Sequence, residues 1–300
     1  MLVETKKWCC LLAMCVAAVG MSEANAGLVA WWNLNDGSGT TAADSSPSPL
    51  GGSSNDGTLV NFGAPPTNWN MDLMDTDSLS MPHGLKFDGG SNQSTGDPPA
   101  SQHVELDSHV PDFTTMTQGT ISLWFRRDAG LGDGAFLGMA NDADNSYFRL
   151  QFEETPQGAT VIRATERIIS GGNDDSVEID APIDDDGKWH HVTYTSDGTN
   201  SKVYVDGVLG ATGLQGIFNV PSADFLSLGF TRRANRPLWY YNGVMGDVRV
   251  YDEVLSLGQI DYISDPANYG NGLAIPEPGS ISVALLALSI GGFCYRNKRG

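Results

Sequence analysis

Cysteine is almost absent from this chain of 300 residues, and the few cysteines lie near its ends. Cys9, Cys10 and Cys15 fall within the first 21 residues, and Cys294 falls in the last ten. The long central part therefore contains no disulfide, no thiolate metal site and no cysteine nucleophile. Its stability has to come from a packed core.

Basic residues are also scarce, with 17 Lys and Arg against 36 Asp and Glu and a formal net charge of −19. Five of the basic residues but only three of the acidic ones lie in the terminal segments, so the charge from Gly27 to Leu273 is near −21. Such a surface repels nucleic acid and anionic membranes, while it favours solubility and divalent cations. We therefore expect no nucleic-acid partner.

Motifs for enzyme chemistry are missing as well. The chain has no Gly-x-Ser-x-Gly elbow, no His-Glu-x-x-His and no phosphate-binding glycine loop. Glu105-Leu106-Asp107 and Glu178-Ile179-Asp180 would each place two carboxylates on one face of a strand, as a retaining glycosidase requires. Ordinary carboxylates of edge strands are the favoured alternative. We predict a protein that is not an enzyme, and a polysaccharide-degrading hydrolase or lyase stays the rival.

Helical periodicity is nearly absent, and short alternating runs take its place. Residues 119–127 alternate, with Ile121, Leu123 and Phe125 on one face. Residues 147–153 repeat the pattern, with an apolar inward face and two polar outward residues, Arg149 and Gln151. Alternation of this kind predicts antiparallel strands with one buried and one solvated face.

Two local signals refine this all-β prediction. Asp206-Gly207 suits the two left-handed positions of a type I′ turn, which predicts a hairpin over residues 202–209. Ser256 followed by Gln259 resembles a capping box, which predicts one short helix near the end of the body.

The N-terminus is typical of a secretory signal peptide over residues 1–26. Lys6 and Lys7 precede an apolar stretch over residues 8–21, and the small residues 24–26 predict cleavage after Ala26. The protein is therefore expected to be exported.

The C-terminus carries Pro276-Glu277-Pro278, an uncharged run over residues 280–295 and a basic end. The run is shorter than the roughly 20 residues of a comfortable transmembrane helix. Residues 274–300 resemble a PEP-CTERM sorting signal with its hydrophobic helix. The resemblance implies an exosortase-type partner, transient membrane association, and delivery to the cell envelope, cell surface or extracellular matrix. An ordinary membrane anchor is the alternative.

Five short blocks follow one another along the body, residues 27–270: Leu28–Leu34, Leu85–Gly89, Trp189–Val192, Val203–Gly207 and Gly243–Tyr251. In content and order they resemble the LamG-like jelly-roll domains. It implies a concanavalin A-like fold, a two-sheet antiparallel jelly-roll sandwich. It also implies a calcium site at the positions of Asp44 and Asp247. The alternative is that Asp44 caps a turn and Asp247 pairs with a neighbouring arginine.

Exposed aromatic rings suggest a glycan ligand. The candidate residues are Trp69, in a long insertion over residues 61–82 that is predicted to be a surface loop, and Trp239, Tyr240 and Arg233 in the loop before the last strand. The alternative is that Trp239 packs on the edge of the sandwich. We predict a non-catalytic surface or matrix protein that binds carbohydrate or another envelope component; a protein–protein adhesion module is a further possibility.

Overall fold

The computed structural model describes residues 27–62, 69–70, 73–74, 80–81, 84–89, 102–128, 132–143, 145–170, 172–214, 216–233 and 236–271. Residues Gly27–Asn271 form one compact unit, which has nearly the bounds of the predicted domain, 27–270. The predicted signal peptide with its cleavage site at Ala26 lies outside the described residues, as does the sorting segment with Pro276, Glu277 and Pro278. None of the helices in the described ranges is long and apolar enough to cross a membrane.

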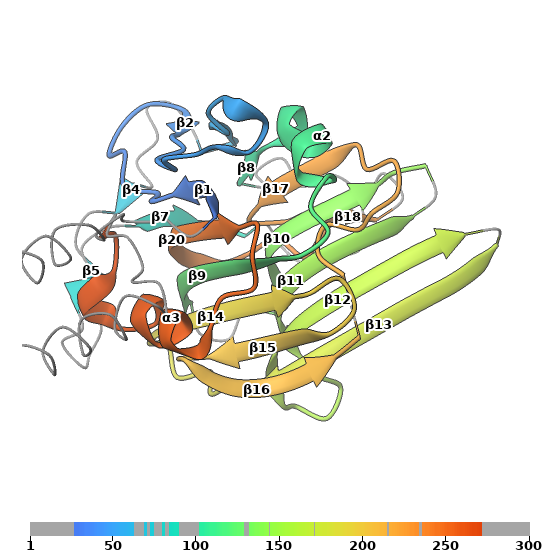
Figure 1. The fold of residues 1–300 in the computed structure, drawn as a ribbon. Coiled ribbons are helices and arrows are strands. Elements are labelled where there is room, and N and C mark those ends of the chain that lie inside the picture. Colours follow the sequence, from blue (N-terminus) through green and yellow to red (C-terminus); the bar gives the residue numbers. More distant parts are fainter. Residues whose placement is uncertain are drawn as a thin grey trace, which may run out of the picture. The chain divides into compact units, whose positions relative to one another are not determined.

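The first sheet is antiparallel and contains the strand predicted over residues 119–127 (Figure 1). Its strands, in spatial order, are β16 (Val208–Gly213), β15 (Ser201–Val205), β14 (Trp189–Ser196), β9 (Gly119–Arg127), β20 (Gly243–Tyr251), β7 (Gly84–Phe87) and β4 (Trp69–Asn70). β1 (Leu28–Trp32) also pairs with β20.

The second sheet faces the first and is antiparallel too. Its order is β13 (Asn173–Pro182), β12 (Thr160–Ser170), β11 (Ser146–Glu154), β10 (Gly134–Asn141), β17 (Phe225–Leu228), β8 (His103–Glu105), β3 (Gly57–Val60) and β2 (Thr41–Ala42). Two small hairpins lie outside both sheets: β5 (Leu73–Met74) with β6 (Ser80–Met81), and β18 (Thr231–Arg233) with β19 (Arg236–Leu238). The predicted two-sheet sandwich is confirmed.

Helical segments are few and short in the described part. They are η1 (Leu50–Gly52), η2 (Asp107–His109), α2 (Val110–Phe113), α3 (Leu257–Ile263) and η3 (Pro266–Asn268). α3 begins at the predicted capping box, where the Ser256 side chain accepts from the Gln259 backbone and the Gln259 side chain accepts from the Ser256 backbone. The predicted hairpin turn is confirmed as well, because Asp206 and Gly207 have φ values of 50° and 77°.

The core fills the space between the sheets. The inward residues of β9 and β11 are all buried, as the alternation predicts: Ile121, Leu123, Phe125, Phe148, Leu150 and Phe152. These aliphatic and aromatic side chains interdigitate across the sandwich and supply the apolar burial that a domain without disulfides needs.

The outer faces differ in part from the prediction, because several of their residues are also buried. On the first sheet, Trp124 is buried beneath the chain that follows β20, since its Nε1 donates to the Ile263 carbonyl and its ring meets Tyr269. On the second sheet, Arg149 and Gln151 are buried although they point away from the core. Alternation within one strand predicts the face to which each side chain points. Whether an outward side chain is exposed to solvent depends on whether a distant segment folds over that face.

Trp69 does not lie in a surface loop, contrary to the prediction from the insertion. It lies in β4, which extends the first sheet by pairing with β7, and the residue is 7% exposed within the core. Its Nε1 donates to the Gly39 carbonyl over 3.4 Å. The insertion therefore sends one large aromatic side chain into the sandwich, which excludes Trp69 as an open sugar-binding platform.

Candidate functional site

The predicted ligand loop lies before β20, and its described residues 230–233 and 236–240 include Thr231, which packs on β10 of the second sheet. Phe230 and Tyr240 stack with ring centroids 5.1 Å apart and join a small buried cluster with Tyr147 and Phe225. Gly138 in β10 makes room for the loop, because a Cβ there would lie 2.4 Å from that of Thr231. Tyr240 is thus a packing residue that anchors the loop, and its burial argues against the predicted contact with a ligand.

Trp239 lies at the end of this loop and is only partly buried. Its φ is 54°, a left-handed conformation that bulky residues rarely adopt, and its carbonyl accepts from the Ala135 amide over 2.7 Å. The ring centroid lies 3.9 Å from the guanidinium carbon of Arg149. Trp239 therefore covers a charged side chain. Arg233 lies in β18 and pairs with Arg236; its side chain is outside what the structure describes.

Arg149 is the central residue of this site. It is 4% exposed and lies between Trp239 and Tyr147, whose ring centroid is 5.0 Å from the guanidinium carbon. Its Nε and Nη1 are buried and have no hydrogen-bond partner. Burial, opposed by the nearby charges of Tyr147 and Glu153, lowers the pKa of Arg149 below its usual value. An unpaired buried cation is expensive, so its presence calls for an explanation.

Three further side chains around Arg149 have buried polar atoms without a partner. They are Gln151 Oε1 on the same strand, Thr165 Oγ1 directly opposite Arg149 on β12, and Thr231 Oγ1 in the covering loop. The Gln151 amide nitrogen donates to Glu153, which leaves its oxygen free to accept. The site therefore combines unused donors of Arg149, which lies under the Trp239 ring, with an unused acceptor and two hydroxyl groups nearby.

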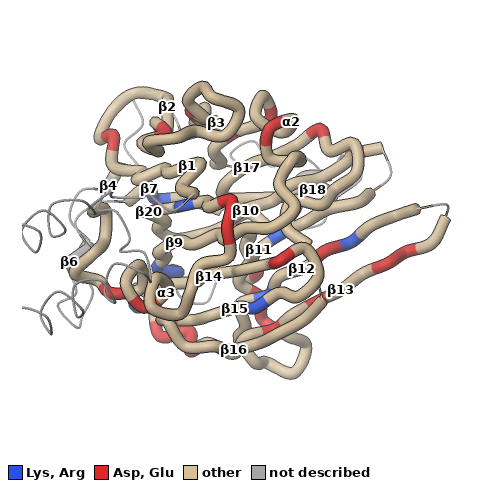
Figure 2. Tube along the Cα trace, in the orientation of Figure 1, with Lys and Arg blue, Asp and Glu red and all other residues tan. Residues whose placement is uncertain are grey.

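The neighbouring arginines are fully paired. Arg163 binds Asp180 through Nε and Nη2, both over 2.6 Å, and Glu153 through Nη1 over 2.5 Å. Arg167 binds Asp174 and donates to the Asn145 carbonyl over 2.9 Å. Figure 2 shows blue positions on β11 and β12 and red positions along the neighbouring edge strand β13. Arg149 differs from both arginines because it forms no ion pair with a carboxylate of the described residues.

Asp44, the first predicted calcium ligand, is occupied by hydrogen bonds from the chain. Its Oδ1 accepts from the amides of Trp31 and Ser46, and its Oδ2 accepts from the backbone and side-chain nitrogens of Asn55, all over 2.8–3.0 Å. This carboxylate joins the opening loops to β1, as the turn-capping alternative requires.

Asp247, the second predicted ligand, pairs with Arg249. The distances are 2.7 Å from Arg249 Nε to Oδ1 and 2.8 Å from Nη2 to Oδ2, and Oδ1 also accepts from the Trp31 indole over 2.7 Å. Both residues are buried. A cation would have to compete with Arg249, so the two carboxylates do not fit a shared calcium site. No cluster of three or more His, Cys, Asp or Glu side chains suited to a metal occurs in the described ranges.

Neither acidic pair resembles a glycosidase site. Glu178 and Asp180 both bind Arg163 on the exposed edge strand β13. Asp107 accepts from the Leu226 amide over 2.9 Å, while Glu105 at the end of β8 is exposed. Each arrangement is accounted for by local hydrogen bonds and ion pairs.

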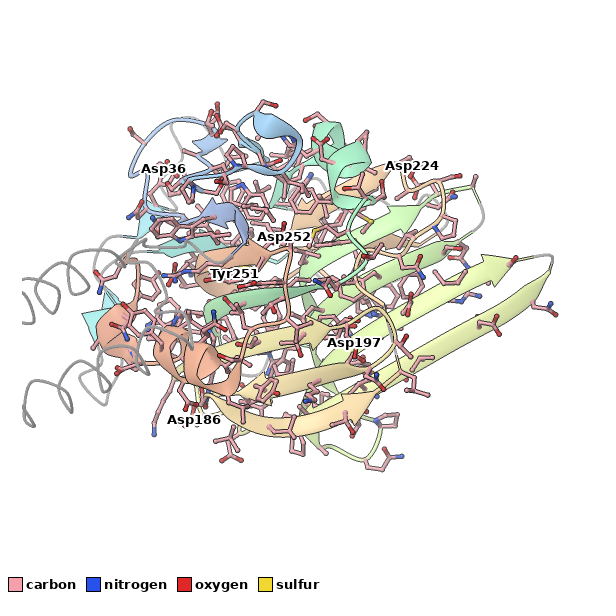
Figure 3. The ribbon with its side chains drawn as sticks, viewed as in Figure 1. Asp36, Asp186, Asp197, Asp224, Tyr251 and Asp252 are labelled. Carbon is pink, nitrogen blue, oxygen red and sulfur yellow. The ribbon has the colours of Figure 1, made fainter. Side chains whose placement is uncertain are left out.

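The adjacent histidines occupy contrasting surroundings. His190 bridges Asp206 and Asp186, the latter labelled in Figure 3, over 2.9 and 3.1 Å. Burial opposes protonation, but these two carboxylates outweigh it and raise the pKa of His190. Burial and the charge of Arg249 instead lower the pKa of His191 to about 3. His191 is thus neutral at ordinary pH.

Sequence reasoning missed Arg149, Gln151, Thr165 and Thr231 as site residues. The alternation of β11 did place Arg149 and Gln151 on the outer face. The covering loop begins about 80 residues later in the chain (Phe230 against Arg149). No local pattern connects the two segments.

Comparison with known proteins agrees with the fold. The family model described as the concanavalin A-like lectin/glucanases superfamily matches residues 98–261, more than half of the chain. A curated relative, the anhydrosialidase of Macrobdella decora, is 21% identical over 207 residues, which are 65% of this chain. The match spans only 27% of that relative's length.

Two solved structures are similar to this chain at low sequence identity. Domain 4 of an extracellular GH43 arabinanase from Geobacillus stearothermophilus, in complex with arabinotriose, is similar over 80% of this chain and 99% of that domain, with 17% identity and a TM-score of 0.51. The CBM40 of the Ruminococcus gnavus IT-sialidase is similar over 60% of this chain and 96% of that module, with 18% identity and a TM-score of 0.49.

Proposed function

The chain belongs to the concanavalin A-like lectin/glucanase superfamily, and we propose that it is an exported, non-catalytic module that binds carbohydrate. The proposed ligand face is the outer face of the second sheet at Trp239. One observation carries the proposal: a partly exposed indole lies over Arg149, whose buried Nε and Nη1 have no hydrogen-bond partner, and unpaired polar atoms of three further side chains lie around this arginine. Sugar recognition needs both an aromatic surface and a few fixed polar groups.

Two further observations support the proposal. A domain with this fold has been solved with arabinotriose, so a sugar is the ligand class to test first. The carboxylates Glu178 and Asp180 are held in ion pairs with Arg163, which favours binding over hydrolysis.

We also propose that the exported protein is processed by an exosortase at Pro276-Glu277-Pro278 and delivered to the cell surface or matrix. Mass spectrometry of the protein recovered from envelope and medium tests this. A mature chain that starts at Gly27 and ends near Glu277 is expected; a chain that keeps residues 280–300 in the membrane would contradict the sorting proposal and indicate an ordinary anchor.

A glycan array with the full chain tests the binding proposal. Trp239→Ala is expected to weaken binding at least tenfold, corresponding to a loss of about 1.4 kcal/mol. The matched control is Tyr262→Ala, which removes a half-exposed ring from α3 on the other sheet. Absence of glycan binding by the wild type would refute the function. Equal binding by Trp239→Ala would refute the site, and release of reducing sugar would establish the enzymatic alternative.

A further inference from the structure

We propose that Arg149 binds a carboxylate and that the ligand is a sugar with a terminal carboxylate group, which reaches the guanidinium by displacing the Trp239 ring. This inference rests on the proposed function, whose site it shares, and it adds the chemical class of the ligand. The inference follows from three observations: Arg149 Nε and Nη1 lack hydrogen-bond partners, polar side chains surround this arginine, and the Trp239 ring covers it.

Arg249 shows what Arg149 lacks. Each is a buried arginine on the outer face of a sheet, 3% and 4% exposed, and each lies against an indole ring, Trp31 at 5.1 Å and Trp239 at 3.9 Å. Arg249 has a bidentate carboxylate partner in Asp247. Arg149 has the same fork of donors, the geometry that matches a carboxylate best, but its Nε and Nη1 have no partner among the described residues. A ligand carboxylate could therefore bind the guanidinium of Arg149 as the Asp247 carboxylate binds that of Arg249.

The groups beside Arg149 indicate a sugar acid rather than a simple anion. Gln151 Oε1 can only accept a hydrogen bond, so it repels an anion but suits a sugar hydroxyl. Thr165 and Thr231 offer hydroxyl groups that both donate and accept. A ligand that places one carboxylate on Arg149 and hydroxyl groups on these three residues would satisfy all the unpaired atoms together.

The surrounding charges favour one terminal carboxylate over a long polyanion. Glu178 and Asp174 on β13 are about half exposed, and the whole chain carries a net charge of −19. A polyanion lying across this face would meet repulsion along its length, whereas a single acidic sugar inserted beside Arg149 is shielded from it. Affinity should accordingly depend only weakly on salt.

Trp239 provides the route to Arg149. Its backbone is fixed by the hydrogen bond from Ala135 to its carbonyl and by the anchoring of Tyr240. Its ring can therefore rotate away while the loop stays in place. The carboxylate then replaces a cation–π contact with charge-assisted hydrogen bonds, and the displaced indole is free to stack on the sugar ring. Binding should change the tryptophan fluorescence.

The experiment measures the dissociation constants of matched ligand pairs with the full chain. The pairs are a disaccharide ending in glucuronic acid with its carboxyl-reduced form, and sialyllactose with lactose, so that the two kinds of sugar acid are separated. Polygalacturonate serves as the polyanion. At least one terminal acid is expected to bind ten- to a hundredfold more tightly than its neutral partner, with a fluorescence change that is absent in Trp239→Phe.

Arg149→Met should remove this preference and leave acidic and neutral sugars equal, and Arg149→Lys, which keeps the charge without the fork, should lose about tenfold. Arg167→Met is the matched control on the same face and should retain the preference. Equal wild-type binding of acidic and neutral sugars would overturn this inference and leave the proposed function standing. No binding of any sugar would overturn both. A preference that survives in Arg149→Lys and Arg149→Met would assign the carboxylate to another residue.

Discussion

Replacing Arg149 by methionine should make the protein more stable while it removes ligand binding. The substitution keeps an unbranched side chain of similar length between Trp239 and Tyr147, so the packing is retained. It removes the buried Nε and Nη1 atoms that have no partner. Most substitutions of buried residues destabilise a protein, so an increase would be a distinctive result.

The magnitude follows from three opposing contributions. Each unpaired buried polar group costs about 1–3 kcal/mol, and more when it is charged. Loss of the stacking on Trp239 and Tyr147 forfeits about 1–2 kcal/mol. Loss of attraction to Glu153 removes a smaller amount. With the lower end of each range, about 2 kcal/mol for the two unpaired atoms against about 1 kcal/mol for the stacking, the balance is a gain of roughly 1 kcal/mol, which for a domain of this size corresponds to a rise in Tm of about 2–4 °C.

Differential scanning calorimetry of the full chain measures this change. Arg163→Met is the matched control, because it removes an equally placed arginine that binds Glu153 and Asp180, and it should lower Tm. Arg149→Lys leaves a buried charge in place and should give no gain. If Arg149→Met lowers Tm as much as Arg163→Met does, Arg149 is a structural residue and the reasoning from its unpaired atoms fails.

Four other predictions concern the remaining polar sites. EDTA should leave Tm unchanged, because both predicted calcium carboxylates are bound within the chain; a fall that Ca²⁺ reverses would contradict this. Asp247→Ala should cost about 3–5 kcal/mol in urea unfolding, since it leaves Arg249 buried and unpaired; an unchanged midpoint would show the pair to be dispensable. His190 has a raised pKa, so its stabilisation is full below about pH 6.5 and is lost as the pH rises through the raised value; His190→Gln should therefore lower Tm at pH 5.5 and have little effect at pH 9. His191 has a lowered pKa, so the free energy of unfolding falls by roughly 1.4 kcal/mol per pH unit from about pH 6.5 down to about 3. This dependence on pH should be missing in His191→Gln. An acid-unfolding profile identical to that of the wild type would refute the assignment.

The fold could be predicted from the sequence because its signals are local. The alternation of residues 119–127 gives β9 with its inward face, and the Asp206-Gly207 turn and the Ser256 capping box each lie within a few residues. Each of these signals has a local physical cause. The two-residue period of side chains acts within one strand, and the left-handed backbone conformation acts within one turn.

The site could not be predicted because it depends on contacts between distant segments. The sequence places Arg149 on an outer face, but its burial comes from Trp239 and the loop that ends there. For Trp69 the sequence predicted a surface loop, but the residue pairs with Leu85 in the neighbouring strand and its side chain lies in the core. The sequence did offer the pairing of Asp247 with an arginine as an alternative, because Arg249 is on the same strand.

The two outer faces suggest why one of them is the ligand face. The first sheet is covered by α3 and the chain up to Tyr269, and there the buried Arg249 meets its carboxylate inside the protein. The second is covered at Arg149 by the partly exposed indole of Trp239, at the end of the covering loop. Opening the first face would require undocking a capped helix together with the buried rings Trp124 and Tyr269, whereas on our proposal the second opens by rotation of the Trp239 ring while the loop stays in place. Since a protein binds where opening costs least and where unpaired groups gain most from a partner, recognition should take place at Trp239 and Arg149.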